Sequence, residues 1–268
     1  MSKRELTVCG GTDVGVHREQ NQDAFAIVDL ASGRVSRSCV RTEVSVEQPG
    51  LLLVVCDGMG GPPAGDVAAR VAATTIKDEL AAAKDEVVAE PTVALERAVH
   101  GANDAILQEA DAHPEERGMG TTCTAAVFSP EGVSVAQVGD SRAYLFREGK
   151  LFPLTRDQTM AEQFVDRGIL RQSQVNGFPF RHVLSQALGT KPGVKPVMTS
   201  VDLKQSDRIV ICSDGLHGPV DEAAISTILS ATPEPREATQ RLIEAALGAG
   251  GPDNVTVVVA DCGRLSDN

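Results

Sequence analysis

The strongest constraint on the fold of this 268-residue chain is a series of short apolar runs, bounded by glycine, proline or aspartate. Such runs, rich in Val, Ile and Leu, are typical of β-strands. Many short strands separated by turn residues favour a β-sandwich or a barrel. We expect strands at residues 6–9, 23–28, 51–56, 122–128, 133–138, 143–146, 197–201, 208–212 and 255–260.

Apolar residues at steps of three and four predict helices between groups of strands. One example is the series Leu95, Val99, Ala102 and Ile106, which marks one helix face. Because strands and helices do not alternate regularly, the pattern favours an α+β fold in which helices cover the outer faces of a central antiparallel β-sandwich. We expect helices over residues 64–83, 92–110, 160–166, 221–229 and 236–247.

The length of the chain allows one large domain or two small ones. No repeat or linker divides the sequence, so we expect a single domain over residues 1–268. Residues 34–46 are polar and alternating, which predicts a solvent-exposed hairpin in an insertion over about 31–50. Residues 155–196 lack a strand pattern and are rich in Arg, Gln, Gly and Pro. A segment this long and irregular is typically functional or mobile.

The composition disfavours a nucleic-acid-binding, membrane-spanning, secreted or disulfide-rich protein. The 25 Lys and Arg residues against 37 Asp and Glu give a net charge of −12, which disfavours binding to nucleic acid. The apolar runs are much shorter than the roughly 18 residues of a membrane helix, and no secretory signal opens the chain. The six cysteines form no CxxC pair. We therefore expect a cytoplasmic protein without membrane contact, structural zinc or a disulfide framework.

Aspartates fall at the ends of predicted strands. Asp57, Asp140 and Asp214 follow apolar runs, and Asp253 lies just before another. Any one of them alone is explained by a turn, because Asp-Gly after a strand is a common turn sequence. Four together are harder to explain this way, since acids at one rim of a sandwich repel one another unless cations lie between them.

These acids suit a site for hard divalent ions such as Mg²⁺, Mn²⁺ or Ca²⁺, which prefer oxygen ligands. A carboxylate shared by two such ions is how two-metal hydrolases activate water for attack on phosphorus. The glycine after Asp57, Gly58, lets a backbone carbonyl approach as a ligand. Arg18 lies close in sequence to Asp23, and arginine binds phosphate through paired charge-assisted hydrogen bonds. The pattern therefore predicts a phosphoester hydrolase.

Six short motifs occur in order along most of the chain. They are TDVGVHREQNQDA (12–24), DGMGG (57–61), GMGTT (118–122), GDSRAY (139–144), SDGL (213–216) and GGPDNVTVVV (250–259). Together they resemble the motifs of bacterial type 2C (PPM family) metal-dependent serine/threonine protein phosphatases, over residues 7–262. The resemblance implies a four-layer α-β-β-α fold. It also implies hydrolysis of phosphoserine and phosphothreonine in proteins by a metal-activated water, opposing Ser/Thr kinases in signal transduction.

The resemblance implies a role for each acidic residue. Asp57 would bridge two Mn²⁺ or Mg²⁺ ions, with Asp214 and Asp253 completing the first metal site. The carbonyl of Gly58 and waters would complete the second site, where Asp23 would hold some of those waters.

The same resemblance implies a third, weakly bound ion at Asp140 and Asp214. It implies that Arg18 binds the substrate phosphate and so acts in catalysis together with Asp57. Residues 155–196 would correspond to the flap, a variable segment beside the active site that influences the choice of substrate.

Several residues depart from the family pattern. Gln22 replaces a frequent Glu and brings no charge, so the second metal site would bind its ion more weakly. Met59 stands where animal relatives have a histidine that acts as general acid, which leaves that role unassigned. His217 lies close in sequence to Asp214 and is a candidate for the general acid, although a structural role is the simpler interpretation. His182 is unusual at the end of the flap, and the sequence assigns it no role.

Two alternatives stay open beside a general protein phosphatase. One is a catalytically weak relative that binds phosphoproteins as a regulatory module, and the other is a phosphatase of an anti-sigma-factor antagonist. The complete set of metal-binding aspartates favours the enzyme, and no sensor domain supports the narrower target. We expect phosphorylated proteins, including Ser/Thr kinases, as partners, and a monomeric chain.

Overall fold

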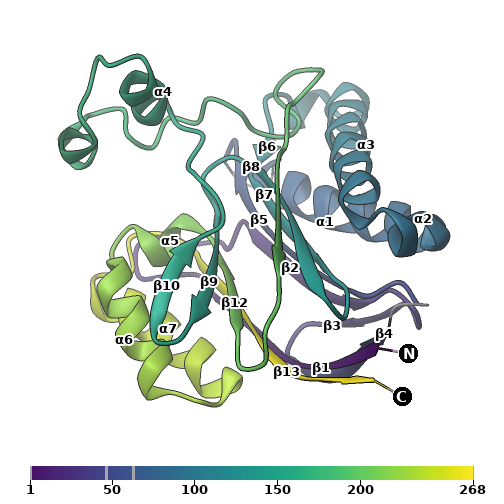
Figure 1. The fold of residues 1–268 in the computed structure, drawn as a ribbon. Helices are drawn as coiled ribbons and strands as arrows, with labels where there is room; N and C mark the ends of the chain where they lie inside the picture. The colour runs from purple at the N-terminus through teal and green to yellow at the C-terminus, as the bar shows by residue number, and fades with distance from the viewer. Residues whose placement is uncertain (1, 46–47, 62–63, 268) are drawn as a thin grey trace.

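The computed structural model describes residues 2–45, 48–61 and 64–267. Two antiparallel sheets pack face to face, and helices cover both outer faces (Figure 1). The predicted α+β sandwich with four layers is therefore confirmed. Among the described residues, no helix combines the length and the apolar character needed to cross a bilayer.

The first sheet has six strands in the order β10-β9-β12-β13-β1-β4. β1 and β13 run well past the predicted ranges 6–9 and 255–260, because they pair with each other from Ser2–Asp267 to Asp13–Val255. The strands of this sheet are β1 (Ser2–Asp13), β4 (Cys39–Ser45), β9 (Arg142–Arg147), β10 (Lys150–Pro153), β12 (Arg208–Cys212) and β13 (Val255–Asp267).

The second sheet follows the order β11-β8-β7-β5-β2-β3, and β6 pairs with β5. Its strands are β2 (Asp23–Asp29), β3 (Arg34–Ser36), β5 (Leu51–Met59), β6 (Gly120–Thr121), β7 (Cys123–Phe128), β8 (Gly132–Val138) and β11 (Val197–Asp202). Successive side chains of a strand point to opposite faces. Accordingly Leu51, Leu53 and Val55 pack between the sheets, whereas Leu52 and Val54 pack under the helices. A strand buried on both faces reads as one continuous apolar run.

Two groups of helices form the outer layers. Ala68 and Ala72 of α1 are fully buried, and their small side chains let α1 pack closely on β5 and α3. The predicted long helices are all present, with ends that differ by no more than two residues. The second sheet carries α1 (Ala64–Ala82), α2 (Lys84–Ala89), α3 (Pro91–Ala112) and the turn η1 (Pro114–Glu116), and the first sheet carries α5 (Asp214–His217), α6 (Glu222–Ala231) and α7 (Pro235–Gly248).

The predicted hairpin over residues 31–50 is wrong in its pairing. β3 pairs with β2 in the second sheet, whereas β4 pairs with β1 in the first, so this segment crosses between the sheets. Val40 and Val44 of β4 belong to the core between the sheets and are not exposed. Residues 46–47 of the predicted hairpin lie outside the described residues.

The sequence predicts no disulfide framework, yet one disulfide is present. The pairing of β1 with β4 places Cys9 directly opposite Cys39, with their Cα atoms 4.0 Å apart, and the two form a disulfide. Because the bond depends on which strands become neighbours, the spacing of the cysteines along the chain did not reveal it.

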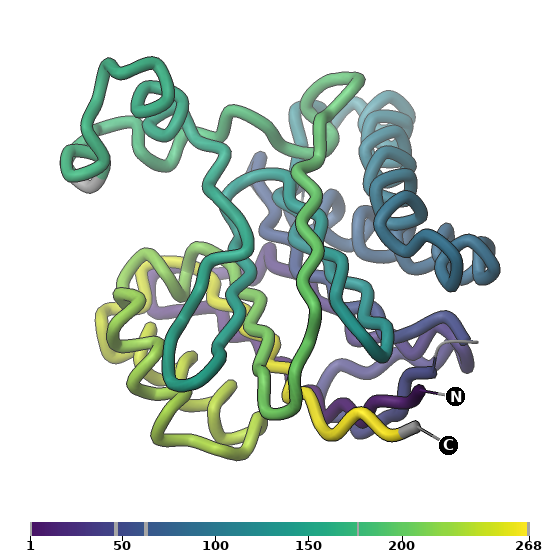
Figure 2. The backbone as a smooth tube through the Cα atoms, in the orientation of Figure 1, coloured from purple at the N-terminus to yellow at the C-terminus, as the bar shows by residue number. Residues whose placement is uncertain are grey.

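Residues 155–196, called the flap segment below, project from one rim of the sandwich (Figures 1 and 2). The segment contains the predicted short helix, α4 (Met160–Asp166), and the turn η2 (Gln172–Gly177). The part of the segment between Thr159 and Leu184 is closed at its base, where these two residues form a β-bridge. The segment is therefore attached to the sandwich at a defined place beside the strand ends.

Candidate active site

The rim of the sandwich below the flap segment gathers the predicted acidic residues. Asp23 and Asp57 are directly paired on β2 and β5. Asp214 begins α5 just after β12, and Asp253 lies just before β13. The predicted strand-end acids thus come from both sheets and meet where the sheets end.

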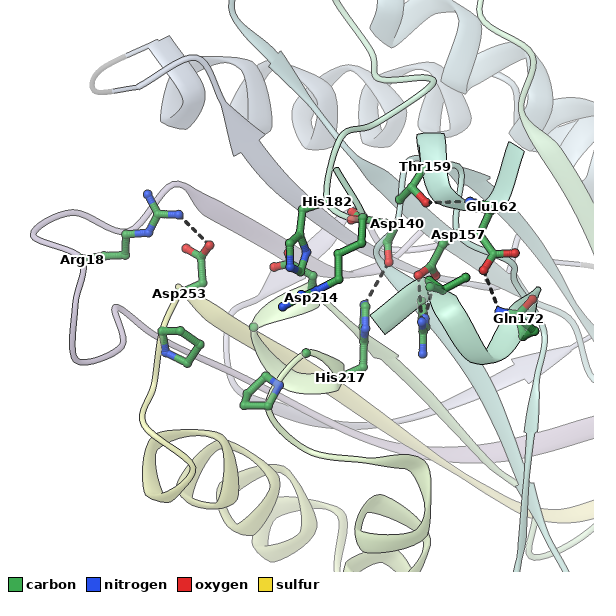
Figure 3. Close-up of a pocket in the computed structure, with 17 residues that line it drawn as sticks. Arg18, Asp140, Asp157, Thr159, Glu162, Gln172, His182, Asp214, His217 and Asp253 are labelled. Atoms are coloured by element: carbon green, nitrogen blue, oxygen red, sulfur yellow. Dashed lines mark hydrogen bonds and ion pairs between the residues drawn. The ribbon is translucent and has the colours of Figure 1, made fainter. Parts of the chain in front are cut away.

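Two adjoining cavities open at this rim, with volumes of about 680 and 710 Å³. Figure 3 shows the first of them, with Arg18 and Asp253 at one end and Glu162 and Gln172 at the other. The second cavity contains Asp57, Gly58 and Gln22. Five residues line both cavities and so lie at their junction: Arg18, Asp140, His182, Asp214 and Asp253.

The carboxyl group of Asp23 is buried and only half satisfied. The hydroxyls of Ser213 and Thr256 each donate to its Oδ2 at 2.7 Å. Within the described residues, its Oδ1 has no hydrogen-bond partner, and neither has Oδ1 of Asp214. Burial raises the pKa of Asp23 to about 7, against the effect of the two hydroxyls, and Asp214 adds to the rise. Unpaired buried oxygens of this kind mark places where a cation would be favourable.

The backbone of Asp57 is held firmly by Thr122. The Asp57 amide donates to Thr122 Oγ1 at 3.0 Å, and the Thr122 amide donates to the Asp57 carbonyl at 2.9 Å. Burial, followed by the nearby charges of Asp23 and Asp214, raises the pKa of Asp57 well above its usual value. Burial and the charge of Asp253 raise the pKa of Asp214 as well. These raised pKa values show that the ionised carboxyl groups at the rim are unfavourable together, so a bound cation would stabilise them.

The loop after Asp57 requires glycine and lies against Gln22. A Cβ atom on Gly58 would lie 2.1 Å from the carbonyl oxygen of Gly65. The Gly58 amide donates to the Gln22 carbonyl at 3.2 Å. The Nε2 of Gln22 is buried and has no partner among the described residues. A Glu carboxylate at this position would add a negative charge to the same site.

Asp140 and His217 form a second group beside Asp214. The His217 Nε2 lies 3.0 Å from the Asp140 backbone oxygen. Burial lowers the pKa of His217 to about 4, so the ring is neutral near pH 7 and its Nε2 donates to this carbonyl. Burial raises the pKa of Asp140 to about 8, with Asp214 as the next cause. This geometry favours the structural interpretation of His217.

Arg18 stands at the exposed edge of the junction. Its Nη2 donates to Asp253 Oδ2 at 2.7 Å, and 51% of its side chain is exposed. This hydrogen bond raises the pKa of the Arg18 guanidinium. A permanently charged and half-exposed guanidinium over an acidic rim can receive the oxygens of a phosphate group.

The sequence did not single out Asn254, which fixes the loop that carries Arg18. Its Nδ2 donates to the carbonyls of Val14 and Gln20 at 2.8 and 3.0 Å. Its Oδ1 accepts the Gln22 amide at 2.8 Å. The only signal in the sequence is its place between Asp253 and the last strand. The bidentate pair of Arg142 and Asp157 in the first cavity was also missed, because its partners come from different elements.

The rim aspartates are close but not tightly converged. Among the described residues, the group that brings three metal-ligating atoms within 4.8 Å of one another is Glu109, His113 and Glu116, at the end of α3 and outside the cavities. The rim offers oxygen donors, which suit Mg²⁺ and Mn²⁺ better than zinc.

Comparisons with known proteins agree with this arrangement. Residues 15–247 match the family model described as Protein phosphatase 2C. The chain is 40% identical over 234 residues to the serine/threonine protein phosphatase PstP of Mycobacterium tuberculosis. This alignment covers 86% of the present chain but 44% of PstP. The chain is 32% identical over 211 residues to the serine/threonine phosphatase stp of Listeria innocua, covering 78% of this chain and 84% of that protein.

A solved structure shares the same fold. It is the catalytic domain of PstP in complex with two manganese ions, which superposes with a TM-score of 0.77 at 34% identity. The match covers 97% of this chain and all of that one. The present chain therefore spans less than half of full-length PstP but the whole of its catalytic domain. On the match over residues 15–247 and these relatives, the chain belongs to the protein phosphatase 2C family.

Proposed function

We propose that this protein is a hydrolase that removes phosphate from phosphoserine and phosphothreonine in protein substrates, with two Mn²⁺ or Mg²⁺ ions at the rim. The observation that carries the proposal is a pair of buried carboxylate oxygens, on Asp23 and Asp214 beside Asp57, that have no hydrogen-bond partner in the part of the chain that the structure describes. The PstP catalytic domain with two manganese ions supports the choice of metal.

The residues at the rim fit the two ions. Asp57 would contact both, and Asp214 and Asp253 would complete one site. The Gly58 carbonyl would complete the other, together with waters held by Asp23. When bound, the ions would supply an activated water and neutralise the phosphate charge. A third ion would bind more weakly at Asp140 and Asp214.

The protein's own side chains would orient the substrate. Arg18 would bind the phosphoryl oxygens, because its guanidinium is half exposed at the junction of the two cavities. Asn254 would hold the Arg18 loop in place through its contacts with Val14 and Gln20. The flap segment would lie against the substrate chain, since its residues form one wall of the first cavity.

The partners would be phosphorylated proteins, including Ser/Thr kinases. The relatives reported above are named as phosphatases, which favours the enzyme over a phosphoprotein-binding module or a phosphatase of an anti-sigma-factor antagonist. A bacterial origin, a cytoplasmic location, a single domain and a monomeric state stay predictions from the sequence. Gel filtration with light scattering would test the last of these.

The test is release of inorganic phosphate from a phosphothreonine peptide by the purified chain. We expect activity with Mn²⁺ or Mg²⁺ and complete loss with a chelator, because the rim acids need the ions to draw in a phosphate. The Asp57→Asn variant serves as the inactive control. Full activity in metal-free buffer would contradict the two-metal proposal, and tight phosphopeptide binding without turnover would support the regulatory alternative.

A further inference from the structure

Cleavage of a phosphoserine or phosphothreonine ester needs a proton at the leaving oxygen. The departing group is an alkoxide, which is a poor leaving group unless a side chain protonates it as the bond breaks. Met59 lines the second cavity but carries no ionisable proton. The proton must therefore come from another group that reaches the phosphate position.

Most proton-bearing groups of the two cavities are already engaged. The rim carboxyl groups, including Asp140, would lose their protons when they hold metal ions. His217 donates to the Asp140 carbonyl and is neutral near pH 7. Arg142 is tied to Asp157 by two hydrogen bonds of 2.6 and 2.7 Å. Arg18 stays charged and does not release its proton.

His182 is placed differently from these groups. It lies on the flap segment and lines both cavities, at the junction where Arg18, Asp140 and Asp214 also lie (Figure 3). Its residue is exposed, and among the described residues its ring has no hydrogen-bond partner. A second histidine, His17, lines only the second cavity. Of the two, His182 alone lines both cavities.

We propose that His182 is the general acid that protonates the leaving Ser or Thr oxygen, a role that rests on the proposed phosphatase function. As a water oxygen bonds to phosphorus, the bond between phosphorus and the ester oxygen breaks and its electron pair stays on that oxygen. This oxygen takes a proton from a ring nitrogen of His182. The products are inorganic phosphate and the free hydroxyl, and the ring regains its proton from solvent.

The test compares leaving groups in the His182→Ala variant, with His17→Ala as the matched control. The substrates are nitrophenyl phosphate, phenyl phosphate and a phosphothreonine peptide, all assayed with saturating Mn²⁺. Nitrophenolate leaves without a proton, so we expect His182→Ala to keep its kcat for nitrophenyl phosphate within about twofold. For phenyl phosphate and the peptide we expect kcat to fall by about 10²–10⁴-fold. His17→Ala should behave like the wild type.

Each other outcome contradicts the proposal in its own way. An equal loss with every substrate would mean that His182 acts on phosphate or metal binding, and no loss would mean that it takes no part. The same pattern in His17→Ala would move the role to the other histidine. If the wild type hydrolyses nitrophenyl phosphate and His182→Ala matches it on every substrate, the phosphatase function stands and only the role of His182 as general acid is refuted. A Mn²⁺ titration of each variant by calorimetry separates altered metal binding from a lost proton donor.

Discussion

Asp23 of β2 lies directly opposite Asp57 of β5 in the antiparallel register, so two buried carboxyl groups share one end of the second sheet. Ser213, which follows β12 of the first sheet, and Thr256 of β13 donate hydrogen bonds to Asp23. Asp23 thus connects the two sheets at the rim. Its hydrogen bonds join parts of the site that lie far apart in the sequence.

The first prediction concerns the pH dependence of stability in the metal-free protein. The pKa values of Asp23 and Asp140 are raised to about 7 and about 8, so the folded state holds these protons more tightly than the unfolded state does. The free energy of unfolding should therefore fall as pH rises from about 4 to about 8, by up to about 1.4 kcal/mol per pH unit for each proton.

Thermal melts in chelator between pH 5 and 8 would measure this effect. The Asp140→Asn variant should show a shallower fall in Tm, because one of the two protons no longer takes part. Asp78→Asn, on the exposed face of α1, is the matched control and should follow the wild type. Parallel curves for wild type and Asp140→Asn would show that the Asp140 carboxyl titrates normally.

A second prediction concerns Asp214, whose buried Oδ1 has no partner among the described residues. Asp214→Asn should lower kcat for phosphopeptide at least about 100-fold, because a neutral amide is a poor ligand for a divalent ion. Metal-free Asp214→Asn should be as stable as the wild type or more so, since one repelling charge is removed. Circular dichroism and melting would confirm the fold, and near-normal turnover would show that Asp214 is no metal ligand.

The sequence predicted much of this rim because strand ends are local features. Continuous runs of Val, Ile and Leu mark β5 and β12, and the acids that follow them can be recognised without knowing the partner strands. Pairing is not local, so the disulfide of Cys9 with Cys39 and the crossing at β3 and β4 were not predicted. The contacts of Asn254 with residues more than 200 positions away were hidden for the same reason.

A third prediction follows from the uncharged Gln22. Gln22→Glu would add a carboxylate next to Gly58, and more negative charge increases affinity for a divalent ion. We expect the Mn²⁺ concentration for half-maximal activity to fall about tenfold, which corresponds to about 1.4 kcal/mol. The metal-free variant should be less stable, because another acid joins the repelling group.

Calorimetric titration with Mn²⁺ would measure the affinity of Gln22→Glu directly. The experiment needs a His113→Ala background, because the Glu109, His113 and Glu116 cluster offers a competing site. Gln240→Glu adds the same charge on the exposed face of α7 and should leave the affinity unchanged. An unchanged affinity in Gln22→Glu would place residue 22 outside the metal sites.

The last prediction concerns Asn254, which holds the loop that carries Arg18 and is not among the proposed metal ligands. Asn254→Ala removes three hydrogen bonds, to Val14, Gln20 and Gln22, and should cost about 1–3 kcal/mol in the free energy of unfolding. Because these bonds hold the loop that carries Arg18, KM for a phosphopeptide should rise several-fold more than kcat falls. Asn254→Asp keeps an acceptor for the Gln22 amide and should be less affected in stability. Denaturant unfolding and steady-state kinetics measure the two effects, and a variant that loses stability while keeping its KM would show that Arg18 is positioned independently of Asn254.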